Sequence, residues 1–109
     1  MKHLIFIDAY NHENFITKVL DRLPKTIKNN NYEILVIDDA SKDETFKTAI
    51  NWSNLNSEIN IKVLKNPTNL GYGGNQKLGF QYAIENNFNT LALLHGDGQY
   101  APEIIVDLI

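Results

Sequence analysis

The chain has 109 residues, of which 43% are hydrophobic and 21% are charged. This length supports one small domain with a single hydrophobic core and is too short for two. The formal net charge of −3 argues against a general nucleic-acid binder, and the absence of cysteine excludes disulfides, thiolate metal sites and cysteine nucleophiles. No apolar run approaches the roughly 20 residues that span a bilayer. We therefore expect a cytoplasmic domain, whose parent protein could still be membrane-associated.

The first third of the chain alternates between strand-like and helix-like hydrophobic patterns. A continuous apolar run at 4–7 predicts a strand buried on both faces. Apolar residues at three- and four-residue spacing from Ile16 predict a helix, which Pro24 ends or kinks. The run at 34–37 predicts a second buried strand.

The same alternation continues in the rest of the chain. Ser41 stands three residues before Glu44, which predicts a capping box at the start of a second helix. The later predicted elements are a strand at 61–64, a helix with Phe80, Ala83 and Ile84 on one face, a strand at 91–94, and a last helix that Pro102 opens and that carries Ile104, Ile105, Leu108 and Ile109.

This order of elements predicts a Rossmann-like, three-layer α/β/α domain with a mostly parallel sheet. Ligands bind such sheets beyond the carboxyl ends of the strands, and polar clusters follow the predicted strands there, at 8–14, 38–43 and 95–100. Asparagine is abundant and scattered, which we attribute to genome composition. The last predicted helix ends in isoleucine after fewer than three turns, so we expect a truncated domain, or self-association through this exposed C-terminal helix.

Asp38 and Asp39 directly follow the second predicted strand. One interpretation is structural: one carboxylate caps the next helix while the other is solvated. The other is functional: a carboxylate at the carboxyl end of a strand accepts hydrogen bonds from the base or ribose of a nucleotide.

All six glycines lie after residue 70, and the stretch 69–75 opens the third predicted helix. Backbone amides at a helix N-terminus suit phosphate, although ordinary loop glycines remain an alternative. The pattern G-x-G-G is neither a dinucleotide fingerprint nor a P-loop. Lys77 could meet an anion there or be a solvated helix residue.

A third candidate site, 95–99, follows the fourth predicted strand. Asp97 lies between two glycines, which leaves room for a hydrated divalent ion and a diphosphate. A tight turn before a helix is the structural alternative.

Four stretches together resemble the family 2 glycosyltransferases of GT-A fold, particularly the dolichyl-phosphate-mannose-synthase-like branch. They are D-A-Y-N-H-E at 8–13, V-I-D-D-A-S-K-D-E-T at 36–45, N-L-G-Y-G at 69–73 and D-G-Q-Y-A-P-E at 97–103. The resemblance covers nearly the whole chain, with the motifs in the family's order.

The resemblance implies a role for each matching residue. The base of a UDP- or GDP-sugar would be bound by Ala9, Tyr10, Glu13 and Asp39, with Asp38 supporting the loop, Gly71 beside the nucleotide and Lys77 facing phosphate. Asp97 would hold Mg²⁺ or Mn²⁺ on the diphosphate, with Gln99 and His95 near the same phosphates. The metal would stabilise the departing nucleoside diphosphate.

The chain departs from the family pattern at three positions and in length. Asp8 replaces a proline, His12 a glutamate, and His95 the first acid of the D-x-D motif. Imidazole suits Mn²⁺ better than Mg²⁺. Family domains are about twice as long, and the general base is expected beyond Ile109. We therefore expect the nucleotide-binding half of an inverting glycosyltransferase, inactive or nearly so alone, that serves a lipid-phosphate or polysaccharide acceptor.

Two other functions compete with this one. A non-catalytic nucleotide-binding or assembly module would also fit the loss of the first D-x-D acid. A phosphoacceptor signalling domain also carries an acidic pair in a parallel sheet. Its pair, however, follows the first strand, and no fifth strand is predicted here.

Overall fold

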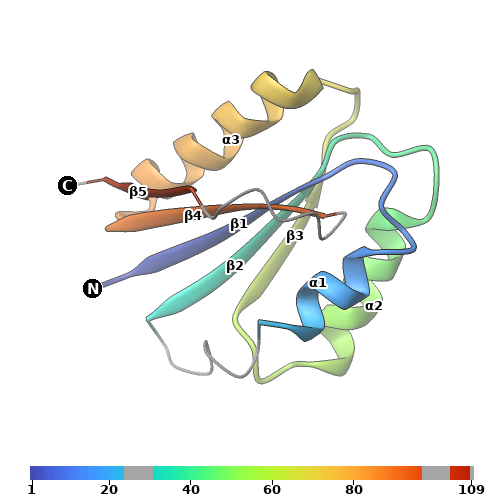
Figure 1. The fold of residues 1–109 in the computed structure, drawn as a ribbon, viewed down its shortest axis with the longest axis horizontal. Coiled ribbons are helices and arrows are strands. Elements are labelled where there is room, and N and C mark those ends of the chain that lie inside the picture. The colour runs from blue at the N-terminus through green and yellow to red at the C-terminus, as the bar shows by residue number, and fades with distance from the viewer. Residues whose placement is uncertain (24–30, 97–103, 109) are drawn as a thin grey trace.

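The computed structural model describes residues 1–23, 31–96 and 104–108, with the side chains of 104–106 left aside. Its elements are, in chain order, β1 (His3–Ala9), α1 (Ile16–Asp21), β2 (Tyr32–Asp38), α2 (Thr45–Leu55), β3 (Ile61–Lys65), α3 (Gly71–Glu85), β4 (Thr90–His95) and β5 (Ile104–Asp107) (Figure 1). Within these ranges, no helix is long and apolar enough to cross a membrane.

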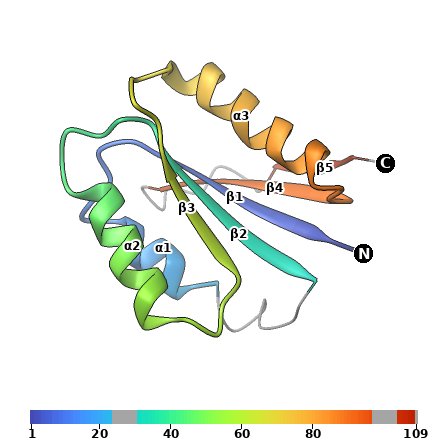
Figure 2. The ribbon, with the colours of Figure 1, turned by 180° about the vertical axis from the view of Figure 1, so that it is seen from behind.

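The five strands form one sheet in the order β3-β2-β1-β4-β5, with β1 at its centre. The first four strands are parallel, and β5 runs antiparallel to β4. Helices α1 and α2 cover one face of the sheet and α3 covers the other (Figures 1 and 2). The predicted three-layer, mostly parallel α/β fold is therefore confirmed.

The alternation of side chains along β1 and β2 divides the core into two clusters. The cluster under α1 and α2 includes Ile5, Ile7, Ala9, Ile34 and Val36. The cluster under α3 includes Leu4, Phe6, Leu35 and Ile37. The same two-residue period puts Asp8 on the α3 face of the sheet and Asp38 on the opposite face.

Glycine has a packing role on the inner side of α3. Gly79 is buried against β1, and a Cβ at this position would overlap the ring of Phe6. The helix can approach the sheet this closely only because residue 79 has no side chain. Gly71, the first residue of α3, has a positive φ of 78°, which also favours glycine.

Two local predictions about helices were wrong. The capping box is absent: α2 begins at Thr45, and its N-cap residue Glu44 makes no side-chain capping bond. The hydroxyl of Ser41 instead donates to Asp38 and accepts a hydrogen bond from the backbone N–H of Asn11. On α3, Ala83 is buried as predicted, but Ile84 is 64% exposed.

The predicted C-terminal helix was also wrong, because residues 104–107 form strand β5. This strand pairs with β4 in an antiparallel register that places Asp107 opposite Thr90. The segment begins with three β-branched residues in a row, which favour a strand over a helix. The fifth strand therefore exists, and the expected self-association through an exposed C-terminal helix loses the helix on which it was based.

Candidate functional site

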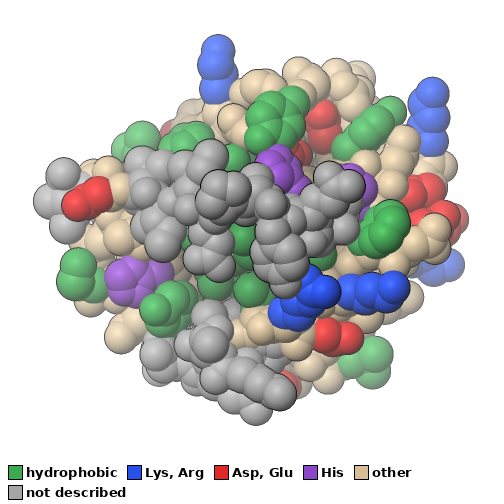
Figure 3. Space-filling model, in the orientation of Figure 1, with side chains coloured by type: hydrophobic (Ala, Val, Ile, Leu, Met, Phe, Trp, Pro, Cys, Tyr) green, Lys and Arg blue, Asp and Glu red, His purple; other side chains and the backbone are tan. Residues whose placement is uncertain are grey.

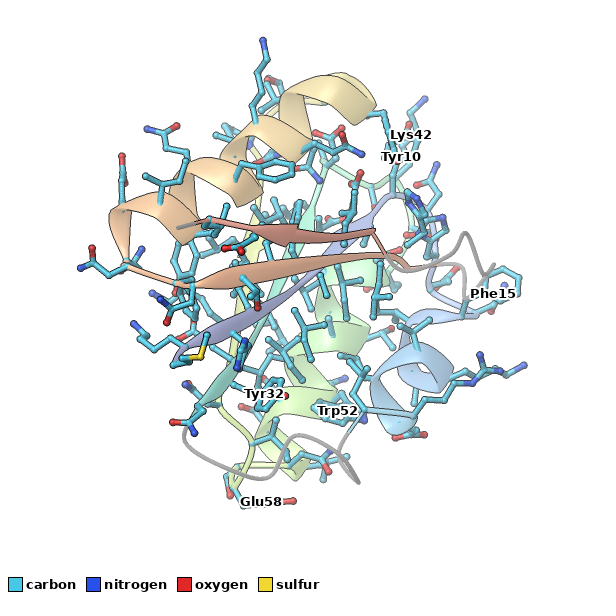
Figure 4. The ribbon with its side chains drawn as sticks, turned by 60° about the vertical axis from the view of Figure 1, so that its left-hand side comes forward. Tyr10, Phe15, Tyr32, Lys42, Trp52 and Glu58 are labelled. Carbon is cyan, nitrogen blue, oxygen red and sulfur yellow. The ribbon has the colours of Figure 1, made fainter. Side chains whose placement is uncertain are left out.

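A cleft of about 360 Å³ opens at the carboxyl end of the parallel strands. Four of its lining residues were predicted as site residues: Tyr10, Asp39, Gly71 and His95. The other four are Asp8, His12, Asn69 and Tyr72. Figure 3 shows histidine side chains on this part of the surface beside hydrophobic and acidic ones. In Figure 4, Tyr10 lies at this end of the molecule, away from Tyr32 and Glu58 at the other end.

Asp39 connects the end of β2 to the segment between β3 and α3. Its Oδ1 accepts hydrogen bonds from the backbone N–H of Leu70 at 2.8 Å and from Nδ2 of Asn66 at 2.9 Å. The side-chain amide of Asn69 donates to its backbone carbonyl at 3.1 Å. These bonds hold the start of α3 against Asp39, so that one wall of the cleft has a fixed geometry.

A second asparagine, Asn75, extends this network to the central strand. It is fully buried on α3, and its Oδ1 accepts a hydrogen bond from Asn66 Nδ2 at 2.9 Å. Its own Nδ2 donates to Asp8 Oδ1 at 2.5 Å and to the carbonyl of Ile37 at 3.2 Å. A buried hydrogen-bonded chain therefore runs Asp39–Asn66–Asn75–Asp8 beneath the cleft.

Sequence reasoning missed both asparagines, because the many asparagines of the chain were attributed to composition. For Asn75 a signal was present. It shares the buried stripe of α3 with Gly79 and Ala83, at four-residue spacing. An amide at a core position of a helix needs hydrogen-bond partners, which indicates a buried polar network.

Asp8 has the most unusual environment of the acids in the described part of the chain. It is 6% exposed, and its Oδ2 is buried without a hydrogen bond from any described residue. Burial raises the pKa of Asp8, and the negative charge of Asp39 adds to this effect. The hydrogen bond from Asn75 and the positive charges of His95 and His12 oppose it.

The loops after β1 and β2 are fastened to each other. The backbone N–H of His12 donates to Thr45 Oγ1 at 2.8 Å, and that of Lys42 donates to Asn11 Oδ1 at 2.9 Å. Asp43 accepts hydrogen bonds from Thr45 and from the N–H of Glu13. Burial alone would raise the pKa of Asp43, but these hydrogen bonds outweigh it and lower the pKa.

The remaining predicted residues lie outside the cleft lining or outside the described residues. Ala9 is buried in the core under α1 and α2. Glu13 takes part in the loop contacts, accepting a hydrogen bond from the N–H of Glu44. Asp38 is fully buried and bonded to Ser41, and Lys77 is exposed on α3.

Asp97 and Gln99 lie outside the described residues. Their nucleotide, metal and phosphate roles stay predictions.

His95 ends β4 at the mouth of the cleft. Its Nε2 lies 3.1 Å from the hydroxyl of Tyr72, and the two rings stack with centroids 5.3 Å apart. The described ranges contain no group of three or more histidine or acidic side chains that could hold a metal ion.

The fold and the position of the cleft define a GT-A-like α/β domain. It superposes on a mannosyltransferase from Pyrobaculum calidifontis, solved with GDP-Man and Mn²⁺, with a TM-score of 0.76 at 15% identity, covering 93% of this chain and 29% of that one. The chain belongs to glycosyl transferase family 2, whose model matches residues 4–109. The predicted family is thus confirmed.

Curated relatives and a further structure agree with this assignment. The chain is 30% identical to a dolichol-phosphate mannosyltransferase of Pyrococcus furiosus, over all of this chain and 29% of the relative. It is 34% identical to a UDP-N-acetylglucosamine–dolichyl-phosphate N-acetylglucosaminyltransferase of Methanococcus voltae, over 96% of this chain and 45% of the relative. The structure of S. aureus TarS with UDP matches at 26% identity and a TM-score of 0.70, over 89% of this chain and 28% of that one. The chain therefore spans less than half the length of these relatives.

Proposed function

We propose that this chain binds the nucleotide part of a UDP- or GDP-sugar for an inverting transfer to a lipid-phosphate or polysaccharide acceptor. The observation that carries the proposal is the cleft at the carboxyl ends of β1, β2 and β4, with Asp39 held in its wall. Parallel α/β sheets bind ligands at this edge. The names of the relatives, which include UDP-N-acetylglucosamine and dolichyl phosphate, support the donor and acceptor classes.

In this proposal Asp39 accepts a hydrogen bond from the base, and Tyr10 offers its ring at the edge of the cleft. Asp39 is 3% exposed, and Tyr10 is 38% exposed. A carboxylate held by two donors within the protein keeps one fixed orientation, which reduces the entropy lost when a ligand binds. The remaining wall, formed by Asn69, Gly71 and Tyr72, would lie next to the nucleotide.

A divalent metal is part of the proposal for the whole site. Two of the matching structures, that of the mannosyltransferase and that of a mycobacterial glucosyl-3-phosphoglycerate synthase, contain Mn²⁺. Asp97 would supply the carboxylate, and Mg²⁺ or Mn²⁺ would neutralise the diphosphate as it leaves. The chemistry that we assign to the described residues is limited to holding the nucleotide.

A non-catalytic nucleotide-binding module is the second candidate. The observation that favours it is His95, which stands where the family pattern has the first acid of D-x-D and which is engaged by Tyr72. Sugar transfer by the parent protein separates the two candidates. Transfer that depends on the nucleotide sugar supports the enzyme, whereas nucleotide binding without transfer supports the module.

Calorimetric titration with UDP and GDP, with and without Mn²⁺, tests nucleotide binding directly. We expect one nucleotide to bind and Asp39→Asn to weaken it at least about tenfold. This variant retains the Oδ1 acceptor for Asn66 and Leu70, so its fold should persist. Asp21→Asn is the matched control, because Asp21 bonds Trp52 at the end of α1. The proposal is contradicted if neither UDP nor GDP binds.

A further inference from the structure

Two departures from the family pattern are neighbours in the sheet. Asp8 stands where the pattern has proline, and His95 stands where it has an acid. They are register partners on the adjacent parallel strands β1 and β4. The backbone N–H of Gly96, the residue after His95, donates to the carbonyl of Asp8 at 3.0 Å. The chain therefore lacks the family's carboxyl group at the end of β4, where it has His95, and carries one instead at Asp8 on the neighbouring strand β1.

The carboxyl group of Asp8 is only half satisfied by the protein. Asn75 bonds Oδ1 at 2.5 Å, whereas Oδ2 receives no hydrogen bond from the described residues although it is buried. A buried polar atom without a partner destabilises the fold, and such atoms in native proteins call for an explanation. Because Asp8 also lines the cleft, a ligand in the cleft can supply the missing donor.

The unpartnered oxygen of Asp8 indicates which part of a nucleotide would lie there. Asp8 and Asp39 are joined through Asn66 and Asn75, and both line the cleft. An acceptor oxygen without a partner requires a ligand group that carries an N–H or O–H donor, which an ionised diphosphate does not offer. The base and ribose of a nucleotide carry such donors.

We propose that Asp8 is a nucleoside-recognition residue, whose Oδ2 accepts a hydrogen bond from a ribose hydroxyl or a ring N–H of the bound nucleotide. This inference rests on the proposed function, since it needs a nucleotide in the cleft. It adds a contact that the alanine-tyrosine part of the first motif and Asp39 do not provide.

The decisive variant is Asp8→Asn. Its Oδ1 can still accept the hydrogen bond from Asn75, so the network beneath the cleft is kept. Its second polar atom is an N–H donor, which cannot accept from a ligand donor. We expect the dissociation constant for the preferred nucleotide to rise at least about tenfold, while the thermal unfolding midpoint stays the same or rises. Asp21→Asn removes the same charge outside the cleft and should leave affinity unchanged.

Titrations of wild type and Asp8→Asn with 2′-deoxy, 3′-deoxy and N-methylated-base analogues identify the donor. The affinity ratio between the two proteins should fall toward one for the analogue that lacks the group bonded to Asp8. An unchanged ratio for every analogue overturns the proposal, as does a lowered unfolding midpoint, which would mean that Oδ2 has a partner within the protein. If both proteins bind the nucleotide equally well, only the role of Asp8 is refuted. If wild type binds no nucleotide, the proposed function is refuted as well.

Discussion

The side-chain amide of Asn75 donates a 2.5 Å hydrogen bond to Oδ1 of Asp8 and so joins α3 to the central strand of the sheet. Asn66 continues the connection from Asn75 to Asp39. Two acids at the ends of neighbouring strands are therefore held by two buried amides. The geometry of the cleft depends on this network as much as on the residues that line it.

Replacement of Asn75 by alanine should destabilise the fold strongly. The change removes one acceptor and one donor and leaves Asp8 Oδ1, the Ile37 carbonyl and part of Asn66 without their partner. Because each buried polar group left unsatisfied costs about 1–3 kcal/mol, we expect a loss of about 3 kcal/mol in the free energy of unfolding, measured by urea denaturation. The control Asn86→Ala, at the exposed end of α3, should cost less than about 1 kcal/mol. Equal losses would contradict the network.

Two glycines of α3 should respond in opposite directions to alanine. Gly79→Ala places a Cβ 2.2 Å from the ring of the buried Phe6, so we expect a loss of about 1–3 kcal/mol despite the better helix propensity of alanine. A Cβ at position 73 meets no atom within 4 Å, so Gly73→Ala should stabilise the chain by about 0.5–1 kcal/mol. Thermal or urea unfolding measures both. Stabilisation by Gly79→Ala would show that α3 does not approach the sheet this closely.

The pH dependence of stability should report the buried carboxyl of Asp8. Burial raises the pKa of this carboxyl in the folded chain above its ordinary value of 3.8, so the folded state holds this proton at pH values where the unfolded state has released it. Stability from this group is present at low pH and is lost as the pH rises through the folded pKa. Asp8→Asn lacks the effect, so its advantage in unfolding free energy over wild type should widen as the pH rises from the ordinary pKa of an aspartate through the raised pKa of Asp8.

Asp43 does not disturb this comparison. The pKa of Asp43 is lowered in the folded chain, so Asp43 stabilises the fold at pH values above its pKa in the unfolded chain. This contribution is lost as the pH falls through the folded pKa. Because Asp43 is present in both proteins, its contribution cancels in the difference. If the difference in the free energy of unfolding between Asp8→Asn and wild type narrows as the pH rises, the carboxylate of Asp8 does not destabilise the folded chain, and the prediction is contradicted.

The alternation of elements could be predicted from the sequence because β1, β2 and β4 each contain four consecutive apolar residues, and β3 has three apolar residues at 61–64. The run at 4–7 lies in the middle of β1, which neighbours cover on both faces. The C-terminal segment was misassigned because Pro102 and the spacing of the isoleucines were given more weight than three consecutive β-branched residues. Whether such a short segment forms a helix or a strand depends on the free edge of β4, which the local sequence does not reveal.

The sequence predicted those residues of the cleft that belong to the family motifs. Tyr10, Asp39, Gly71 and His95 were expected at one edge of the sheet, and all four line the cleft. The motif around Asp38 did not show that strand alternation turns this side chain toward Ser41, on the opposite face from Asp8. Asn66 and Asn75 could not be paired from sequence alone, since they meet only when α3 packs on the sheet.

The most direct test of nucleotide binding at this cleft is a backbone amide NMR titration of the chain with UDP and with GDP. We expect one nucleotide to shift the signals of four residues that line the cleft: Tyr10, Asp39, Gly71 and His95. Signals of Tyr32 and Glu58, at the opposite end of the molecule in Figure 4, should stay in place. Saturating nucleotide that moves none of the cleft signals, or that moves mainly those at the opposite end, would contradict it.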